Sequence, residues 1–333
     1  MKSNKYEIDM CNGSIMDKLV SFALPLMLSG ILQLMFNAVD IIVVGRFSGS
    51  EALAAVGSTT ALINVFTNLF IGISLGANVL AARFFAAGRR EEMSETVHTS
   101  ITLALISGIF MAFVGLIFSK GALELMGTPE DVIGLSTLYM RIYFMGMPFF
   151  MLYNYGAAIL RAVGDTKRPL YFLIIAGVIN AGLNMVLVIV FGLGVAGVGI
   201  ATVFSQMVSC VLVLTCLCRT EGSYKLSFSK LSMKGYYLKQ IFQVGIPAGI
   251  QSTVINFSNA LLQSSVNSFG STAMAGYTAA NNILGFLYVS INSVTQACMS
   301  FTSQNFGVGK YKRMDRVLID CMILSVGAAL VLG

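Results

Sequence analysis

One acid stands on a polar stripe within an otherwise apolar segment near the start of the chain. Asp40 lies toward the end of residues 19–44, a run long enough to cross a bilayer, which takes about 20 apolar residues. At about 100° per residue, four polar residues fall within one narrow sector of this helix. They are Ser29, Gln33, Asn37 and Asp40. An ionisable group inside a membrane span is costly, so Asp40 is a candidate for binding a proton or a cation. The alternative is an anchor at the membrane surface that pairs with Arg46.

Further polar residues recur in later apolar segments. Asn180 and Asn184 share a helix face at i, i+4 spacing, and Thr202 is polar within the following segment. Asn64 and Asn68 stand in the second segment. Amides at this density indicate either a helix that lines water or a polar contact between helices, and the spacing leaves both open.

Residues able to do enzyme chemistry are scarce. The chain has one histidine, His98, which follows a charged loop and is expected at the surface. The sequence shows no pair of membrane-embedded acids that could serve as general acid and general base, and no cluster of metal ligands is evident. Tyr139, Arg141 and Tyr143 are typical of an aromatic belt at the membrane surface. We therefore expect no enzyme activity and no cofactor.

Composition sets the class of protein that must position these residues. Hydrophobic residues make up 56% of the chain and charged residues 11%, and the mean hydropathy is +0.81. Soluble domains carry about 25% charged residues, so the sequence predicts an all-α integral membrane protein solvated by lipid. The net charge of +6 lies in the loops, which argues against nucleic acid as a partner.

Apolar runs between charged breaks predict the membrane-spanning helices. Their ranges are 19–44, 52–82, 96–118, 132–160, 169–191, 195–218, 238–266 and 274–304, with a ninth that begins near 316. All of the 21 basic residues except Arg46, Lys120 and Arg141 fall in loops on one side of this arrangement. The positive-inside rule then places the N-terminus in the cytoplasm of a multi-pass protein of the inner or plasma membrane.

The chain resembles itself at an offset of about 222 residues, which pairs Pro25 with Pro247 and Asn37 with Asn259. Both copies enter the membrane from the same side, so they are parallel repeats of six helices. We expect an N-lobe at 1–218 (helices 1–6), a cytoplasmic linker at 219–239 and an incomplete C-lobe at 240–333 (helices 7–8 and the start of 9). Two copies of six helices make twelve, of which about eight and a half are present. A complete second copy therefore needs about three more helices and about 110 more residues.

Three motifs resemble one transporter family. They are NAVDIIVVGRFSGSEALAAVG, LRAVGDTKRPL and NAGLNMVLVIVFGLGVAGVGIAT. The whole chain resembles the multidrug and toxic compound extrusion (MATE) transporters, whose superfamily also holds flippases of lipid-linked oligosaccharides. The resemblance implies twelve helices in two six-helix lobes around a V-shaped cavity, and export of organic cations driven by protons or sodium.

The resemblance to the DinF-like branch of this family implies a cation-coupling site in the N-lobe. Its matching positions are Asp40, Asn180, Asn184 and Thr202, which also form a possible Na⁺ site. Asn184 stands where that branch commonly has aspartate. One carboxylate therefore remains, which weakens the expectation of tight sodium binding.

The leading hypothesis is a secondary multidrug antiporter coupled through Asp40, working as a monomer in membrane lipid on small-molecule drugs or toxins. The residues expected to line its substrate cavity are Gln33, Asn37, Asn64, Asn68, Asn256, Asn259, Asn281 and Asn282. The alternative is a flippase for a lipid-linked oligosaccharide or another lipid, which needs basic residues in the cavity to hold phosphates.

Overall fold

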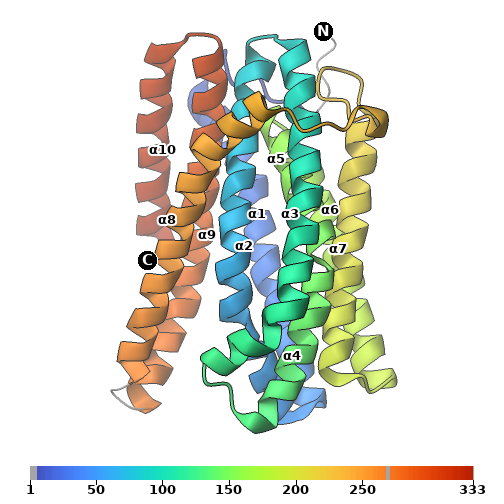
Figure 1. Ribbon diagram of the computed structural model, residues 1–333. Helices are drawn as coiled ribbons and strands as arrows, with labels where there is room; N and C mark the ends of the chain where they lie inside the picture. The colour runs from blue at the N-terminus through green and yellow to red at the C-terminus, as the bar shows by residue number, and fades with distance from the viewer. Residues whose placement is uncertain (1–5, 268–270, 333) are drawn as a thin grey trace.

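The computed structural model describes residues 6–267 and 271–332, and this part of the chain is built from helices (Figure 1). The α-helices are α1 (Ile15–Phe47), α2 (Gly49–Ala86), α3 (Arg90–Leu125), α4 (Glu130–Met145), α5 (Met147–Ala162), α6 (Lys167–Asn184), α7 (Gly194–Arg219), α8 (Gly235–Asn267), α9 (Ser271–Gly307) and α10 (Tyr311–Leu332). A π-helix, η1 (Met185–Val190), continues α6, and a short 3-10 helix, η2 (Phe228–Lys230), lies between α7 and α8. The predicted all-α class is confirmed.

The fourth predicted span, residues 132–160, is wrong as a single helix. It divides into α4 and α5 at Gly146, whose backbone N–H donates to the Tyr143 carbonyl at 3.0 Å. Pro148 causes the break, because it lacks an N–H and its ring excludes the carbonyl of the residue four positions earlier. The two short helices therefore replace one long one.

Five helical segments are long and apolar enough to cross a membrane, judged by length and composition within the described residues. They are Ile15–Phe47, Gly49–Ala86, Arg90–Leu125, Lys167–Val190 and Gly194–Arg219. In the described part of the chain, the remaining helices are too short or too polar to meet the same criterion, whereas nine spans were predicted. For example, α4 and α5 have 16 residues each.

The outer faces of the bundle are apolar. On α3, Phe113, Ile117 and Phe118 are each more than 60% exposed, and their spacing places them on one side of the helix. A contiguous apolar face of this kind is unfavourable in water and favourable in lipid. The exposed surface therefore agrees with an integral membrane protein.

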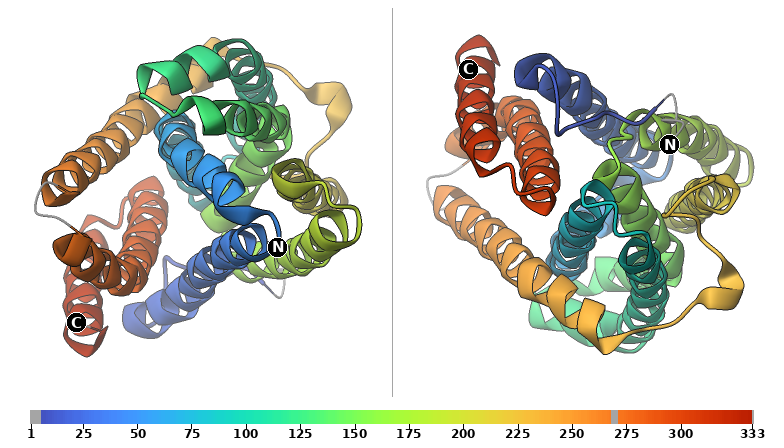
Figure 2. Two further views of the ribbon diagram at one scale, coloured as in Figure 1. Left: turned by 90° about the horizontal axis from the view of Figure 1, so that it is seen from below. Right: turned by 90° about the horizontal axis from the view of Figure 1, so that it is seen from above.

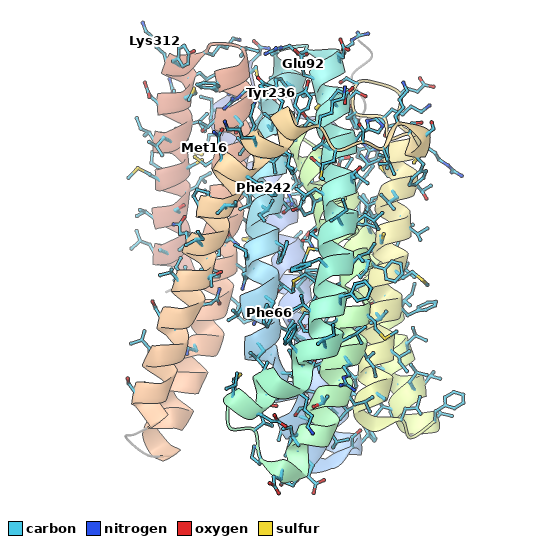
Figure 3. The ribbon with its side chains drawn as sticks, in the orientation of Figure 1. Met16, Phe66, Glu92, Tyr236, Phe242 and Lys312 are labelled. Carbon is cyan, nitrogen blue, oxygen red and sulfur yellow. The ribbon has the colours of Figure 1, made fainter. Side chains whose placement is uncertain are left out.

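Connections alternate between the two ends of the bundle (Figure 1). The N-terminal segment and the connections at 87–89, 163–166, 220–234 and 308–310 lie at one end, which also carries most of the lysines and arginines. We call it the basic end, and the opposite one the far end. Figure 3 shows Glu92 and Lys312 at the basic end and Phe66 well toward the far end. The alternation agrees with the predicted loop pattern.

Helices α2 and α8 cross almost backbone to backbone (Figure 2). A Cβ added to Gly72 would lie 2.2 Å from the Gly249 Cα, and one added to Gly76 would lie 2.2 Å from the Ile241 carbonyl oxygen. Small residues permit such close contact between membrane helices. We call this contact the glycine seam.

Helix α9 packs against α1 through apolar side chains. The Phe22 and Phe301 rings meet edge to face with centroids 5.7 Å apart, and a Cβ on Gly30 would strike the Val289 side chain. These contacts, like the glycine seam, lie in the half nearer the basic end. Toward the far end, α8 and α9 lean away from α2 (Figure 1). The division into an N-lobe, a linker and a C-lobe stays a prediction.

Candidate functional site

Three of the four predicted coupling residues meet in the far half of the bundle. The side-chain amide of Asn184 donates hydrogen bonds to the Asp40 carboxylate and, at 3.2 Å, to Oδ1 of Asn180. Asn184 is fully buried, Asn180 is 6% exposed and Asp40 is half-buried. The structure thus joins an acid on α1 to an amide pair on α6.

The contact between α1 and α6 depends on one glycine. A Cβ on Gly177 would lie 1.9 Å from the Phe36 ring, so the ring lies directly on the α6 backbone. Asp40 follows Phe36 by about one helical turn, and Asn184 follows Gly177 by about two. Because both helices run from the basic end to the far end, this close contact brings Asp40 and Asn184 together.

The helix widens immediately after Asn184. This residue precedes η1, a π-helix of six residues. π-helical turns in proteins occur frequently at functional sites, because the changed backbone spacing re-aims side chains. The sequence showed no signal for it, since the segment MVLVIV fits an ordinary apolar helix equally well.

Thr202 is the fourth predicted member, and its position is different. It is half-buried on α7, and its hydroxyl donates to the Val198 carbonyl of its own helix at 2.9 Å. Within the described residues, no direct hydrogen bond joins it to Asp40 or Asn184. The structure therefore brings three of the four residues into direct contact.

One oxygen atom in the cluster lacks a donor. Within the part of the chain that is described, Oδ1 of Asn184 is buried without a hydrogen-bond partner. Such an orphan is costly, and in native proteins it calls for an explanation such as a missing ion or proton. Together with the Asp40 carboxylate it forms the oxygen-rich donor set that hard cations prefer. The residues therefore fit a small cation, or a proton on Asp40.

The alternative for Asp40, an anchor paired with Arg46, gains no support. Arg46 is exposed, and Asp40 is not a member of any ion pair formed between the described residues. The contact observed for Asp40 is the one to Asn184, across two helices.

The aromatic belt predicted at 139–143 is wrong for Tyr139. This side chain is 7% exposed, its ring centroid lies 6.2 Å from that of Tyr143, and both phenols interact electrostatically with Asp40. Helix α4 lies at the far end, where its inner face packs against α2, α3 and α7. The spacing i, i+4 beside an arginine fits both positions, so sequence reasoning missed these two tyrosines as neighbours of the acid.

The predicted cavity residues lie on α1, α2, α8 and α9, the helices that diverge toward the far end. Those exposed are Gln33, Asn37, Asn64, Asn259 and Asn281, and those half-buried are Asn68 and Asn256. The side chain of Asn282 lies outside the described residues. That these residues share one substrate cavity stays a prediction.

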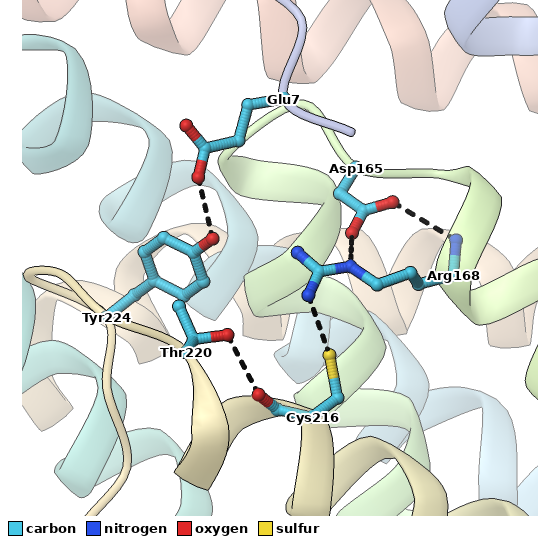
Figure 4. A network of polar contacts seen from close by, with 6 residues as sticks. All are labelled: Glu7, Asp165, Arg168, Cys216, Thr220 and Tyr224. Atoms are coloured by element: carbon cyan, nitrogen blue, oxygen red, sulfur yellow. Dashed lines mark hydrogen bonds and ion pairs between the residues drawn. The ribbon is translucent and has the colours of Figure 1, made fainter. Parts of the chain in front are cut away.

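A second polar cluster at the basic end fixes where α6 begins (Figure 4). Asp165 accepts the Arg168 backbone N–H at 3.1 Å and forms an ion pair with its guanidinium, which also donates to the Cys216 sulfur of α7 at 3.1 Å. Burial raises the pKa of Asp165, although Arg168 opposes the shift. The start of α6 sets the rotation of that helix, and so the direction of Asn180 and Asn184.

The same cluster ties the N-terminal segment to the connection after α7. The Tyr224 hydroxyl donates to Glu7 at 2.7 Å, and burial raises the pKa of Tyr224 to about 12 (Figure 4). Nearby, the Thr220 hydroxyl donates to the Cys216 carbonyl at 2.8 Å. These contacts hold the predicted linker against the bundle.

His98, expected at the surface, is 2% exposed. Its Nε2 accepts the Ser227 backbone N–H at 3.2 Å, so its Nδ1 carries the proton and donates to the Ser94 carbonyl at 2.7 Å. The connection from α7 to α8 passes in front of α3 in Figure 1 and brings Ser227 onto the ring. A contact so distant in sequence could not be predicted from the neighbours of His98.

Comparison with known proteins gives a family match. A family model described as MatE matches residues 25–186 and 247–333, and the two stretches begin at the paired prolines of the predicted repeat. The probable multidrug resistance protein YoeA of Bacillus subtilis (strain 168) is 34% identical over 306 residues, which are 89% of this chain and 66% of YoeA. A protein of Shewanella oneidensis (strain MR-1) named FAD transporter is 24% identical, over 90% of this chain and 67% of its own length. The chain thus spans about two-thirds of the length of these relatives.

Solved structures share the fold. One, titled as the outward-facing conformation of a multidrug resistance MATE family transporter of the MOP superfamily, superposes with a TM-score of 0.91. The match covers 100% of this chain and 74% of that structure at 23% sequence identity. At this identity, the similarity establishes the fold alone.

Proposed function

The chain belongs to the MatE family of membrane transporters, and we propose that it is a secondary antiporter that exports amphipathic or cationic organic compounds. Protons or sodium ions are the exchanged species, and Asp40 is the residue that binds them. The observation that carries this proposal is the hydrogen bond between Asp40 and Asn184, which places a half-buried acid against buried amides in the far half of the bundle.

A proton on Asp40 completes the hydrogen bonding of the cluster. A carboxylic acid and a primary amide can form a ring of two hydrogen bonds, in which the acid O–H donates to the amide oxygen and the amide N–H donates to the acid carbonyl. Oδ1 of Asn184 is the oxygen that lacks a donor when Asp40 is ionised. Protonation therefore removes both an uncompensated charge and an orphan acceptor.

A monovalent cation can replace that proton. Sodium bound between the Asp40 carboxylate and Oδ1 of Asn184 neutralises the single charge of the cluster and uses the same orphan oxygen. A second carboxylate at position 184 adds another charge and favours the metal ion over the proton. Asn184→Asp is therefore expected to increase the dependence of transport on sodium.

The expected cargo follows from the residues of the diverging helices. Their cavity candidates are amides, and apolar side chains such as Val254 and Leu284 are more than half exposed beside them. Such a surface suits apolar cations, whose charge can exchange with that of the coupling ion. The relative YoeA, named a probable multidrug resistance protein, supports this class.

Anionic, phosphate-bearing cargo is the second candidate, since one relative is named FAD transporter and flippases belong to the same superfamily. It needs arginine or lysine side chains in the cavity. The candidates Gln33, Asn37 and Asn64 offer amides instead, so we place this cargo second.

We also place the basic end in the cytoplasm of a cell membrane, because loops rich in lysine and arginine remain on that side. The segment before α1 lies at the same end (Figure 1). The protein is expected to work as a monomer within lipid.

Efflux from proteoliposomes tests the proposal. The purified protein is reconstituted into liposomes that are loaded with a fluorescent organic cation. A proton gradient or a sodium gradient is then imposed across the membrane, each in a separate experiment. Asp40→Asn keeps the volume of the side chain but removes its exchangeable charge. Efflux should therefore fall, under both gradients, to the rate of dye-loaded liposomes that contain no protein. Asp17→Asn, which changes an exposed acid in the first turn of the same helix, is the matched control and should retain wild-type efflux.

Two results would contradict the proposal. Wild-type efflux by Asp40→Asn under both gradients removes Asp40 from the coupling site. Transport of FAD, but of no organic cation, by the wild-type protein favours the second cargo class.

A further inference from the structure

Buried amides of α9 reach backbone carbonyls of other segments at the basic end. Gln304 Nε2 donates to the Ala162 carbonyl at 2.7 Å, and Asn305 Nδ2 donates to the Met10 carbonyl at 3.1 Å. Gln304 is 3% exposed and Asn305 is fully buried. Ala162 ends α5, and Met10 lies in the N-terminal segment before α1, so α9 is bound to two separate parts of α1–α7 and its N-terminal extension.

A third buried amide connects three helices in the same region. Asn78 of α2 donates through Nδ2 to the Ala158 carbonyl of α5 at 2.8 Å. Its Oδ1 accepts the hydroxyl of Ser300 on α9 at 3.1 Å. Asn78 is 3% exposed and Ser300 is 1% exposed. We call Asn78, Gln304 and Asn305 with their partners the amide clasp.

Charged side chains extend the clasp to the surface. Lys310 Nζ donates to the Cys11 carbonyl at 2.9 Å and to Oδ1 of Asn12 at 2.8 Å, and Arg313 Nη2 donates to the Asn12 carbonyl at 3.1 Å. These acceptors belong to the N-terminal segment. Polar contacts between α9–α10 and this segment thus run from the interior to the solvent, beside the buried Met10 side chain, which packs against apolar residues.

The acceptors of the clasp are suited to repeated release. The Ala162 carbonyl, at a helix C-terminus, and the Met10 carbonyl, in an irregular segment, have no partner in regular secondary structure, so water can replace the amide donors when the contact opens. The net change is then small, because one hydrogen bond is exchanged for another. Oδ1 of Asn305 has no partner among the described residues, and opening allows water to reach it. An apolar contact of equal area has no such compensation.

We propose that the amide clasp is the gate at the basic end: it holds α9 against α1–α7 while the far end is open, and its release opens the basic end as the far end closes. This inference rests on the proposed transport function, in which the two ends open alternately. Gln304, Asn305 and Asn78 are positioning residues, because they set the balance between the two conformations and do not bind cargo or ion.

Thiol labelling from each side measures that balance without cargo or an ion gradient. Native Cys11 is half-buried beside Gln304, with Sγ 3.9 Å from Oε1, and reports on the basic end in inside-out vesicles. Val65→Cys reports on the far end in intact cells, because Val65 lies on the same face of α2 as Leu69 and Gly72, which contact α8. Each reporter is used in a protein whose other cysteines are replaced by alanine or serine.

The test variants are Gln304→Met and Asn305→Leu, which keep the side-chain volume and remove the donor. Ser303→Ala is the matched control, because Ser303 is buried on the same helix and its hydroxyl donates to the Met299 carbonyl of α9 itself. Loss of one such hydrogen bond is expected to raise the labelling rate of Cys11 about 5- to 10-fold and to lower that of Val65→Cys. Ser303→Ala should leave both rates unchanged.

Each other outcome overturns the gate. Unchanged rates in both variants show that the clasp does not affect the balance. Faster labelling of Cys11 without slower labelling of Val65→Cys indicates local loosening of the N-terminal segment. An equal effect of Ser303→Ala indicates a general packing defect. The labelling result is independent of the Asp40→Asn efflux result, so failure of the antiport proposal and failure of the gate are distinguishable.

Discussion

Two of the contact surfaces that hold α8 and α9 against α1–α7 are built differently. In the glycine seam, Gly72 and Gly76 of α2 face Gly249 and the Ile241 carbonyl of α8 with no side chain between the backbones. In the amide clasp, side chains of α9 extend to carbonyls of Ala162 and other residues. Both surfaces lie in the half nearer the basic end, and both join segments more than 140 residues apart in sequence.

The difference shows which surface can move. Backbones in direct contact allow rotation about the point of contact, but separating them leaves a void that lipid or water must fill. The amides of the clasp can exchange carbonyl partners for water. We infer that α8 turns on α2 at the glycine seam while the clasp opens and closes.

The largest effect is expected at the glycine seam. Gly72→Leu places a side chain where even a Cβ lies 2.2 Å from the Gly249 backbone, so it should lower the free energy of unfolding by about 3 kcal/mol. Gly57→Leu on the same helix is the control, because a Cβ there has no atom within 4 Å. The measurement is the thermal unfolding of the purified proteins in detergent. Equal stability of the two variants would show that the seam is loosely packed.

A smaller effect is expected in the clasp. Asn78→Leu leaves the Ala158 carbonyl without its extra donor and Ser300 without its acceptor, which should cost about 1–3 kcal/mol of stability. Thr60→Val is the control, since the exposed Thr60 hydroxyl donates to the Val56 carbonyl of its own helix. A loss larger than that of Gly72→Leu, in the same unfolding assay, would reverse the proposed order of the two surfaces.

The smallest effect depends on pH and involves the outer edge of the clasp. Burial acts to raise the pKa of Asp9, but hydrogen bonds from Asn12 and the Cys11 backbone, with the charge of Lys18, lower it on balance below its ordinary 3.8. A lowered pKa stabilises the folded state above the ordinary value, and this stabilisation is lost as the pH falls below 3.8. Asp9→Asn should therefore lower stability slightly at pH 7 and have a smaller effect near pH 3.

The check is the difference in unfolding temperature between wild type and Asp9→Asn at the two pH values. Because Asp9 is largely exposed, we expect a difference of only a few tenths of a kcal/mol at pH 7. The glycine seam has no titratable group among its contacting residues Gly72, Gly76, Ile241 and Gly249, so the Gly72→Leu deficit should be the same at both pH values. A pH-dependent deficit for Gly72→Leu would contradict the separation of the two surfaces.

Much of the site was predictable because it depends on local signals. Asp40 is an isolated acid in an apolar run, and Asn180 and Asn184 share a face at i, i+4 spacing. Their grouping came from the family resemblance, and the structure places the acid and the two amides in contact. Thr202 came from the same resemblance, but its hydroxyl bonds to its own helix.

The residues that were missed all act across long distances in the sequence. Tyr139 was assigned to the membrane surface, because nothing in its sequence neighbours reveals that this face of α4 packs against other helices. His98 was assigned to the surface, because the segment that buries it, at Ser227, lies 129 residues later in the sequence. Gln304 and Asn305 carry no motif, and their partners Ala162 and Met10 are identified by backbone position rather than by residue type.

The sequence by itself determined that lipid surrounds this protein, and it determined the order of the helices along the chain. Apolar runs must form helices in lipid, because every backbone polar group there needs an internal partner. Loop charges then mark the basic end. The break at Gly146 was not predicted, although Pro148 two residues later is its cause.

Only the tertiary structure decided which polar atoms meet. Hydrophobic periodicity assigns a residue to a helix face, but the neighbour on that face depends on how closely two helices approach. That distance depends on single glycines such as Gly177 and Gly72, whose missing side chains allow Phe36 and the α8 backbone to lie directly on the helices that carry them. The Asp40 cluster, the glycine seam and the amide clasp all follow from such contacts, which no local pattern encodes.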